Sequence, residues 1–288
     1  MNKRNSYPAL LIVLYNPSHE DLQNIINMSN NYKGIVVDNS PLPNFQNENI
    51  NNFEYISFGK NYGIGFAQEY GIKCLIRKKE ISHIFFLDQD TRVDAHYINL
   101  MLSEYERISN SNIKLALLGP RVVNFDTNQE YYSKHESNKD SISDFVYRKN
   151  IISSGSCISC SILKVVGYPN SALFIDYVDS EWCWRINKIG YVCCQTKKIS
   201  ITHRIGEKTI NLGVMQDIIS KPFRYYFQYR NYLWLLKVKY VPKKWKIKNG
   251  IRLCLRLFYL PFFTTSYRGC YKNMFKGIKD GITKKGIN

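Results

Sequence analysis

The chain has 288 residues, of which 44% are hydrophobic, and it carries a formal net charge of +17. This length and apolar content are enough for one large folded domain, or for one domain with an appendage, and they exclude a disordered or fibrous protein. The excess of cations predicts an anionic partner, which could be a nucleic acid, a nucleotide-linked substrate or an acidic membrane surface.

The first half of the chain alternates short apolar runs with segments of helical periodicity. This alternation is typical of a parallel sheet covered by helices. The expected strands are 9–14, 34–37, 53–57, 83–87 and 115–118, and the expected helices are 19–29, 66–78 and 95–108. The pattern therefore predicts an α/β fold, with a Rossmann-like, mostly parallel central sheet flanked by helices.

The second half is less regular. Residues 124–150 are polar and have no clear period, which indicates a long surface loop or a pair of exposed strands. Order is expected to return at 151–167. Residues 174–190 predict a loop followed by a helix that ends at Gly190, and 191–195 predicts a further strand.

Cations are concentrated toward the end of the chain. From Arg204 onward there are nineteen Lys and Arg residues but only three acids. Segments 223–232 and 245–263 each combine apolar residues with a basic flank, which is typical of helices that lie on a membrane surface. The cations of the second segment are Lys246, Lys248, Arg252 and Arg256. We expect a main domain at 1–221 and a basic, aromatic helical extension at 222–288.

No export signal is expected, because the apolar run at 8–14 is too short for a secretory leader. The eight cysteines include one Cys-x-x-Cys, at Cys157 and Cys160, but no second pair with zinc-ribbon spacing. Free, buried thiols are therefore the preferred interpretation over a metal site or disulfides.

Two carboxylates, Asp88 and Asp90, end the apolar run at 84–87. Residues spaced i, i+2 on a strand point the same way, so both carboxylates can converge on one hard cation at the carboxyl end of the strand. Open α/β sheets bind their ligands at this edge. The alternative is a solvated turn after a buried strand.

A second acidic cluster consists of Asp176, Asp179 and Glu181. If Asp179 faces the first pair across a cleft, it can act as a general base while Asp88 and Asp90 bind metal. Acids that complement the dipole of a solvated helix N-terminus are the alternative. The neighbouring aromatic residues, among them Trp182, favour stacking on a sugar ring.

Three further features have more than one interpretation. The glycines of segment 61–67 lack the third glycine of a dinucleotide loop, because Gln68 stands at its position, so they indicate either tight helix packing or close approach to a ligand. Asp38, at the end of the second expected strand, is either a turn residue or a contact for a base or ribose. His203 could complete a metal site, although a lone histidine is usually not a ligand.

Taken together, the motifs resemble those of family 2 inverting glycosyltransferases with the GT-A fold, and most closely the bacterial rhamnosyltransferases. The resemblance covers roughly residues 8–235. Its motifs are Tyr15-Asn16-Pro17, Val37-Asp38-Asn39-Ser40, Asn61-Tyr62-Gly63-Ile64-Gly65, Phe86-Leu87-Asp88-Gln89-Asp90, Ser153-Ser154-Gly155-Ser156, Phe174 to Trp182, and His203. Glu69 departs from the pattern, since such sequences often have Asn there.

The resemblance implies a role for each matched residue. Residues 1–221 would form the nucleotide-sugar-binding and catalytic domain, with Asp179 as the catalytic base. Asp88, Asp90 and His203 would bind Mg²⁺ or Mn²⁺. The donor would contact Asn16, Asp38, Asn61, Asp88 and Gln89, and the acceptor would contact Asp176, Glu181 and Trp182.

The function implied is inverting transfer of a sugar, preferably L-rhamnose from dTDP-β-L-rhamnose, to a hydroxyl of a lipid-linked saccharide in bacterial surface polysaccharide biosynthesis. A galactofuranosyl or other hexosyl transferase is the near alternative. The extension at 222–288 would hold the enzyme on the anionic inner face of the cytoplasmic membrane, or contact a second copy of the chain in a homodimer. The rival from another class, a non-catalytic nucleic-acid binder, is disfavoured because no RNA- or DNA-binding motif is present.

Overall fold

The computed structural model describes residues 6–45, 50–124, 130, 144–203, 208–211 and 216–287. The strands are β1 (Tyr7–Leu14), β2 (Lys33–Asp38), β3 (Phe53–Ser57), β4 (Ile81–Asp88), β5 (Leu115–Asn124), β6 (Phe145–Arg148), β7 (Cys157–Ser159), β8 (Val192–His203), β9 (Lys208–Asn211) and β10 (Gln216–Ile219). The helices are α1 (His19–Asn31), α2 (Ile64–Leu75), α3 (Ala95–Ser109), α4 (Cys160–Val166), α5 (Val178–Lys188), α6 (Pro222–Lys237), α7 (Lys243–Tyr259) and α8 (Tyr267–Thr283), with 3₁₀ turns η2 (Ser171–Leu173) and η3 (Leu260–Phe262).

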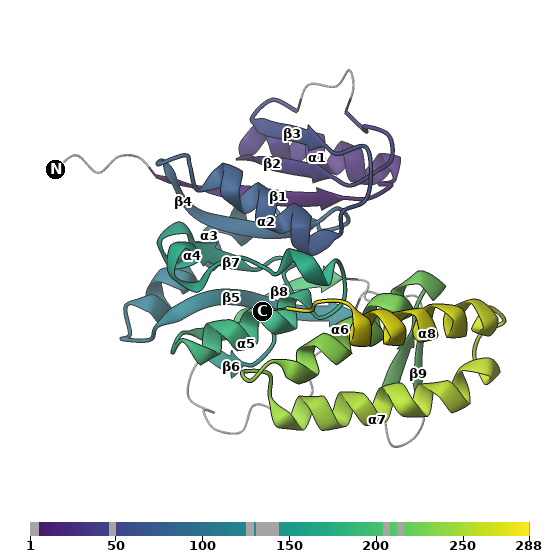
Figure 1. Cartoon of the computed structure of the whole chain (residues 1–288). Coiled ribbons are helices and arrows are strands. Elements are labelled where there is room, and N and C mark those ends of the chain that lie inside the picture. The colour runs from purple at the N-terminus through teal and green to yellow at the C-terminus, as the bar shows by residue number, and fades with distance from the viewer. Residues whose placement is uncertain are drawn as a thin grey trace.

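Among the described residues, eight strands form one sheet in the order β3-β2-β1-β4-β7-β5-β8-β6, and β9 and β10 form a separate hairpin. β6 and β7 run antiparallel to their neighbours, whereas the other strands of the sheet run in one direction. The prediction of a mostly parallel α/β sheet is therefore confirmed (Figure 1).

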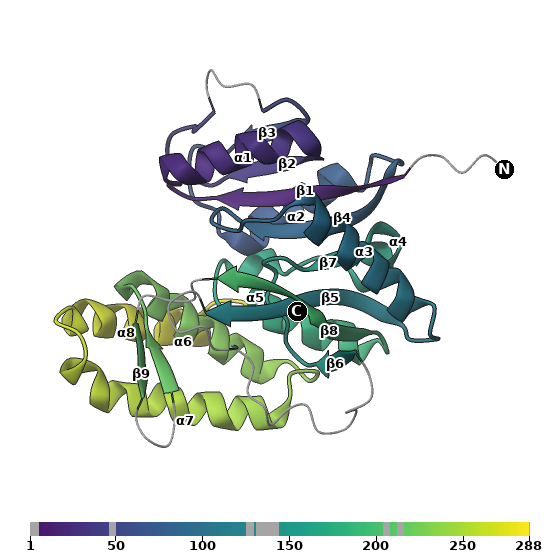
Figure 2. The same ribbon diagram turned by 180° about the vertical axis from the view of Figure 1, so that it is seen from behind.

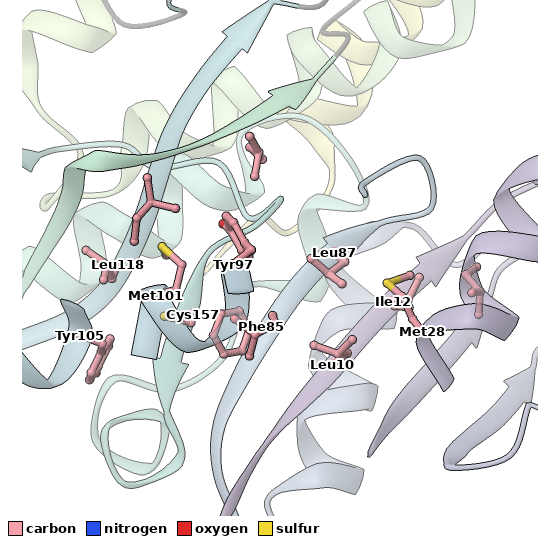
Figure 3. Packing of buried hydrophobic residues seen from close by; sticks show 14 of the residues in the cluster. Leu10, Ile12, Met28, Phe85, Leu87, Tyr97, Met101, Tyr105, Leu118 and Cys157 are labelled. Atoms are coloured by element: carbon pink, nitrogen blue, oxygen red, sulfur yellow. The ribbon is translucent and has the colours of Figure 1, made fainter. Parts of the chain in front are cut away.

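Helices cover both faces of this sheet. Alternate side chains of β1 point to opposite faces: Leu10 and Ile12 pack with α1 and α3 on one face, and Leu11 packs with α2 on the other (Figures 1 and 2). Figure 3 shows the first of these layers, in which Met101 of α3 lies close to the sheet residues. Burial on both faces explains why the strands are nearly continuous apolar runs.

The C-terminal helices pack against one another and against the main domain. Glycines of α8 face α6: a Cβ at Gly277 would lie 2.3 Å from the carbonyl oxygen of Tyr226, so only glycine allows this approach of the two helices. Trp184 of α5 shares a buried apolar cluster with residues that include Leu235 of α6 and Val241. The extension is thus joined to the main domain through a common core.

The structure corrects the role expected for Arg256. Its side chain is buried and forms an ion pair with Asp217 at 2.5 Å, with Gln228 and Tyr259 completing the network. Arg256 therefore holds α7 inside the helical region and does not belong to an exposed basic flank. In the described ranges, no helix combines the length and apolar character needed to cross a bilayer.

Candidate active site

A cleft of about 660 Å³ lies where β1 and β4 end. Its walls come from the ends of these strands, the start of α2, residues 150–154, the segment before and at the start of α5, and the first residues of α6. The polar side chains that line it include Asn39, Asn61, Asp88, Gln89, Asp90, Ser153, Ser154, Asp176, Asp179, Ser180 and Arg224. The cleft therefore brings the acidic pair Asp88 and Asp90 together with Asp176 and Asp179 of the second predicted cluster.

Asp88 is the last residue of β4 and lies beside Val13 of β1. The backbone turns directly after it, since the Thr91 N–H donates to the Asp88 carbonyl at 3.0 Å. Gln89 is held in this turn because its Oε1 accepts the Tyr15 N–H at 2.9 Å. Asp88 is half-buried and Asp90 is exposed, and both line the cleft.

The carboxylate oxygens of Asp88 and Asp90 suit a hard divalent cation. Mg²⁺ is commonly bound by one or two carboxylates, with substrate phosphates and water filling the other positions. Within the described ranges, no group of three or more His, Cys, Asp or Glu side chains could hold a metal ion by itself. Phosphate oxygens of a bound substrate could complete the ligand set around Asp88 and Asp90. His203 ends β8, and its side chain lies outside the described part of the chain.

Asp179 lies in the first turn of α5. Its Oδ2 accepts the Ser153 N–H at 3.3 Å, and the Ser153 hydroxyl accepts a hydrogen bond from Gln68 at 3.0 Å. Burial, reinforced by the negative charge of Asp88, raises the pKa of Asp179 to about 7, although the Ser153 hydrogen bond opposes the rise. A carboxylate with a pKa near neutrality is suited to accept a proton from a substrate.

The glycine loop before α2 packs against the segment that leads to α5. A Cβ at Gly63 would lie 2.5 Å from the Phe174 carbonyl oxygen, and the Gly65 N–H donates to that oxygen at 3.3 Å. Asn61 accepts the Gly63 N–H at 2.8 Å, and Asn39 donates to the Gly63 carbonyl at 3.2 Å. Tight packing explains both glycines, and the loop still forms part of the cleft wall.

Asp38 has no exposed area, and its carboxylate is occupied from within the chain. It accepts hydrogen bonds from the Ser40 N–H at 2.8 Å, the Tyr55 hydroxyl at 2.6 Å and the Asn44 side chain at 2.8 Å. The donor contact expected of Asp38 is therefore corrected to a structural one, in which it shapes the turn after β2. Asn16, exposed and with a φ of 48°, lines a hollow of about 360 Å³ beside this turn.

The second acidic cluster is divided between the cleft and the protein interior. Asp176 lines the cleft and forms an ion pair with Arg224 at 2.6 Å. Glu181 is fully buried and is bonded to Arg185 at 2.8 Å, while Trp182 is 1% exposed and packs edge-on against Phe86. The expected acceptor contacts of Glu181 and Trp182 are therefore wrong, because α5 turns both side chains toward the core.

Some cleft residues were not predicted as contacts. Arg224 and Phe223 reach the cleft from α6. The sequence signal is the cation that follows Pro222 within an aromatic segment, but the same pattern also predicts a membrane-surface helix. For Trp182 the signal was its spacing from Val178 and Ile186, i, i+4 and i+8, which places all three on one buried face of α5.

A larger hollow, of about 910 Å³, lies between the start of α1, the loop before α3 and β8. It includes Asp90 but neither Asp88 nor Asp179. The smaller cleft holds Asp88, Asp90 and Asp179 together, so it is the better candidate for the active site.

No protein-family model matches the chain. The curated protein dTDP-rhamnosyl transferase RfbF of Shigella flexneri is 32% identical over 260 residues, which cover 86% of each chain. The chain belongs to this rhamnosyltransferase-like family of glycosyltransferases. The resemblance inferred from its motifs is thereby confirmed.

Solved structures agree on the fold. GalNAc-T7, crystallised with UDP, GalNAc and Mn²⁺, superposes with a TM-score of 0.55 at 11% identity, covering 88% of this chain and 55% of the other. S. aureus TarS gives 0.54 at 11% identity, covering 96% and 49%, and its fragment 1–349 gives 0.53, covering 96% and 81%. The chain thus spans about half the length of the first two proteins and has the GT-A fold that they share.

Proposed function

We propose that this glycosyltransferase moves L-rhamnose from dTDP-β-L-rhamnose to a hydroxyl of a lipid-linked saccharide, with inversion, during assembly of a bacterial surface polysaccharide. The observation that carries the proposal is the cleft in which Asp88 and Asp90 lie in the same space as Asp179. The name of the Shigella relative supports the donor. A galactofuranosyl or other hexosyl donor is the alternative within the same chemistry.

The reaction we propose is a single displacement. The Asp179 carboxylate takes the proton of the acceptor hydroxyl while that oxygen forms a bond to the anomeric carbon and the bond from this carbon to the nucleotide phosphate breaks. Asp88 and Asp90 would hold Mg²⁺ or Mn²⁺, which when bound offsets the negative charge that develops on the leaving diphosphate. Asn61 and Gln89 of the cleft, and Asn16 of the neighbouring hollow, would contact the nucleotide.

Inversion requires one base and no carboxylate nucleophile. Asp176 is the other acid beside Asp179 in the cleft, and it is already paired with Arg224. This pairing supports a role in positioning the acceptor or in orienting Arg224, and it argues against a covalent intermediate on Asp176. The product from a β-linked donor would then be an α-L-rhamnoside.

The proposal is tested by measuring nucleotide release from dTDP-rhamnose, UDP-galactofuranose, UDP-glucose and UDP-N-acetylglucosamine, with Mn²⁺ or with EDTA. We expect metal-dependent turnover of dTDP-rhamnose that is lost in Asp88→Ala and Asp179→Ala. Asp94→Asn is the matched control, because Asp94 caps α3 outside the cleft through a hydrogen bond that Asn can also accept. Full activity of the Asp88 or Asp179 variant would refute the assignment.

We further propose that the outer side of α7 rests on the anionic inner face of the cytoplasmic membrane, where a lipid-linked acceptor would be found. From Ile251 to Phe262 the exposed residues carry no charge: Ile251, Cys254, Leu255, Phe258, Pro261 and Phe262. Phe258 is 74% exposed and Phe262 83%. Lys243, Lys244 and Lys248 are exposed at the start of the helix. Apolar side chains beside cations suit the interface of an acidic bilayer.

Sedimentation with vesicles tests this docking. Burying one phenylalanine contributes about 1.5–3 kcal/mol, so Phe258→Ser with Phe262→Ser removes about 3–6 kcal/mol and should weaken binding to phosphatidylglycerol vesicles at least about 100-fold. Leu42→Ser is the control, because Leu42 is also 74% exposed but lies in the turn after β2. Unchanged vesicle binding would refute the docking, and a dimer that is lost in the double variant would assign the surface to a second copy of the chain.

A further inference from the structure

The segment that leads into α5 has an unusual backbone. Phe174, Asp176 and Tyr177 have φ values of 65°, 63° and 67°, in the left-handed region that non-glycine residues rarely adopt. The Ile175 N–H donates to the Leu173 carbonyl at 2.8 Å, which makes Phe174 the centre of a tight γ-turn. Such a backbone persists only where surrounding contacts hold it.

Asn231 of α6 provides those contacts. Its side chain is fully buried, and its Nδ2 donates to the carbonyl oxygens of Leu173 at 2.8 Å, Ile175 at 2.8 Å and Asp176 at 3.1 Å. Its Oδ1 accepts the Arg230 Nε–H at 3.0 Å, which fixes the orientation of the amide. One side chain thus satisfies the backbone on both sides of the γ-turn.

The neighbouring α6 residues strengthen this contact. Arg230 donates to the carbonyl oxygens of Ala172 at 2.9 Å and Leu173 at 3.0 Å, and its guanidinium lies 4.3 Å from the centre of the Trp234 ring. The ring of Phe227 stacks on that of Phe174 at 4.4 Å, with only 4° between their planes. Residues 172–177 are therefore held by side chains from two consecutive turns of α6.

These contacts of α6 hold the segment that comes directly before the helix of Asp179. Tyr177 caps α5, and Asp179 follows two residues later in the first turn of that helix. We propose that Asn231 is a positioning residue, which sets the place of Asp179 in the cleft by holding the left-handed turn at 174–177. The inference rests on the proposed role of Asp179 as base. It makes α6 a structural part of the active site.

The test compares Asn231→Asp and Asn231→Leu with the native chain in the nucleotide-release assay. Asp keeps the volume and the acceptor facing Arg230 but loses both N–H donors, and Leu keeps the volume without charge. We expect kcat per folded molecule to fall at least tenfold in both variants, while the KM for the donor stays within about twofold. Tyr229→Phe is the control, because it removes a buried bond from the same helix to Leu253 without touching the turn.

Three results would overturn the inference: unchanged kcat per folded molecule, a donor KM that rises as much as kcat falls, or an equal loss in Tyr229→Phe. If neither Asn231 variant folds, Phe227→Leu gives the same test by removing the stack on Phe174, with an expected fall in kcat of about threefold. Asp179→Asn is measured in parallel. Full activity in that variant would refute the proposed base, whereas an inactive Asp179→Asn beside fully active Asn231 variants would refute only the positioning role.

Discussion

Replacing Asp179 by Asn should abolish sugar transfer and also make the protein more stable above neutral pH. Burial and the charge of Asp88 raise the pKa of Asp179 from 3.8 to about 7. Between these two pH values the folded protein keeps a proton that the unfolded chain has released, so stability falls as the pH rises from about 4 to about 7 and then levels off. Asn cannot ionise, and its side-chain oxygen can still accept the Ser153 N–H.

The size of this effect follows from the pKa shift. Each pH unit contributes about 1.4 kcal/mol, so the variant should gain about 4 kcal/mol at pH 8 but only about 1.5 kcal/mol at pH 5. Urea unfolding at both pH values, in EDTA and without nucleotide, measures the difference. An equal gain at both pH values, or none at pH 8, would refute the reasoning, and Asp94→Asn should show no comparable gain.

Three further substitutions follow from the structure. Trp182→Ala should lower the free energy of unfolding by about 3–5 kcal/mol in a urea titration, yet leave the acceptor KM of the folded protein unchanged, since the side chain is buried. Gly63→Ala should lower the melting temperature, because its Cβ would clash with the Phe174 carbonyl, and an unchanged melting temperature would contradict that contact. Arg256→Met should lower the free energy of unfolding by about 3–5 kcal/mol, because it leaves Asp217 buried without its partner. The folded fraction should still bind vesicles. Weaker vesicle binding would show that Arg256 contacts the membrane after all.

Much of the N-terminal half of the fold could be predicted, because the sequence signals of its strands and helices are local. The predicted strand at 83–87 and the helix at 19–29 lie within β4 and α1. A run of apolar residues that ends in Asp88 needs no information from distant parts of the chain. The expected position of Asp88 and Asp90 at the carboxyl edge of the sheet agrees with the structure for this reason.

Features that depend on distant segments could not be predicted. Asp38 ends its strand as Asp88 does, but Tyr55 and Asn44 occupy its carboxylate. The bounds of α8 within the predicted helical extension could not be given, since its glycines are unfavourable in an isolated helix and Gly277 is explained only by its contact with α6. The left-handed residues before α5 are not glycines, so no sequence rule for turns identifies them.

The contact between the glycine loop and Phe174 has a consequence for acceptor choice. The Gly65 N–H donates to the Phe174 carbonyl oxygen, and this bond joins the start of α2 to the segment that leads to Asp179. Under the proposed mechanism, the distance between the leaving group and Asp179 is then set before either substrate binds. An acceptor would be selected by whether one of its hydroxyls reaches across that distance. The hydrogen bond from the Gly65 N–H to the Phe174 carbonyl would then help to determine which hydroxyl is glycosylated.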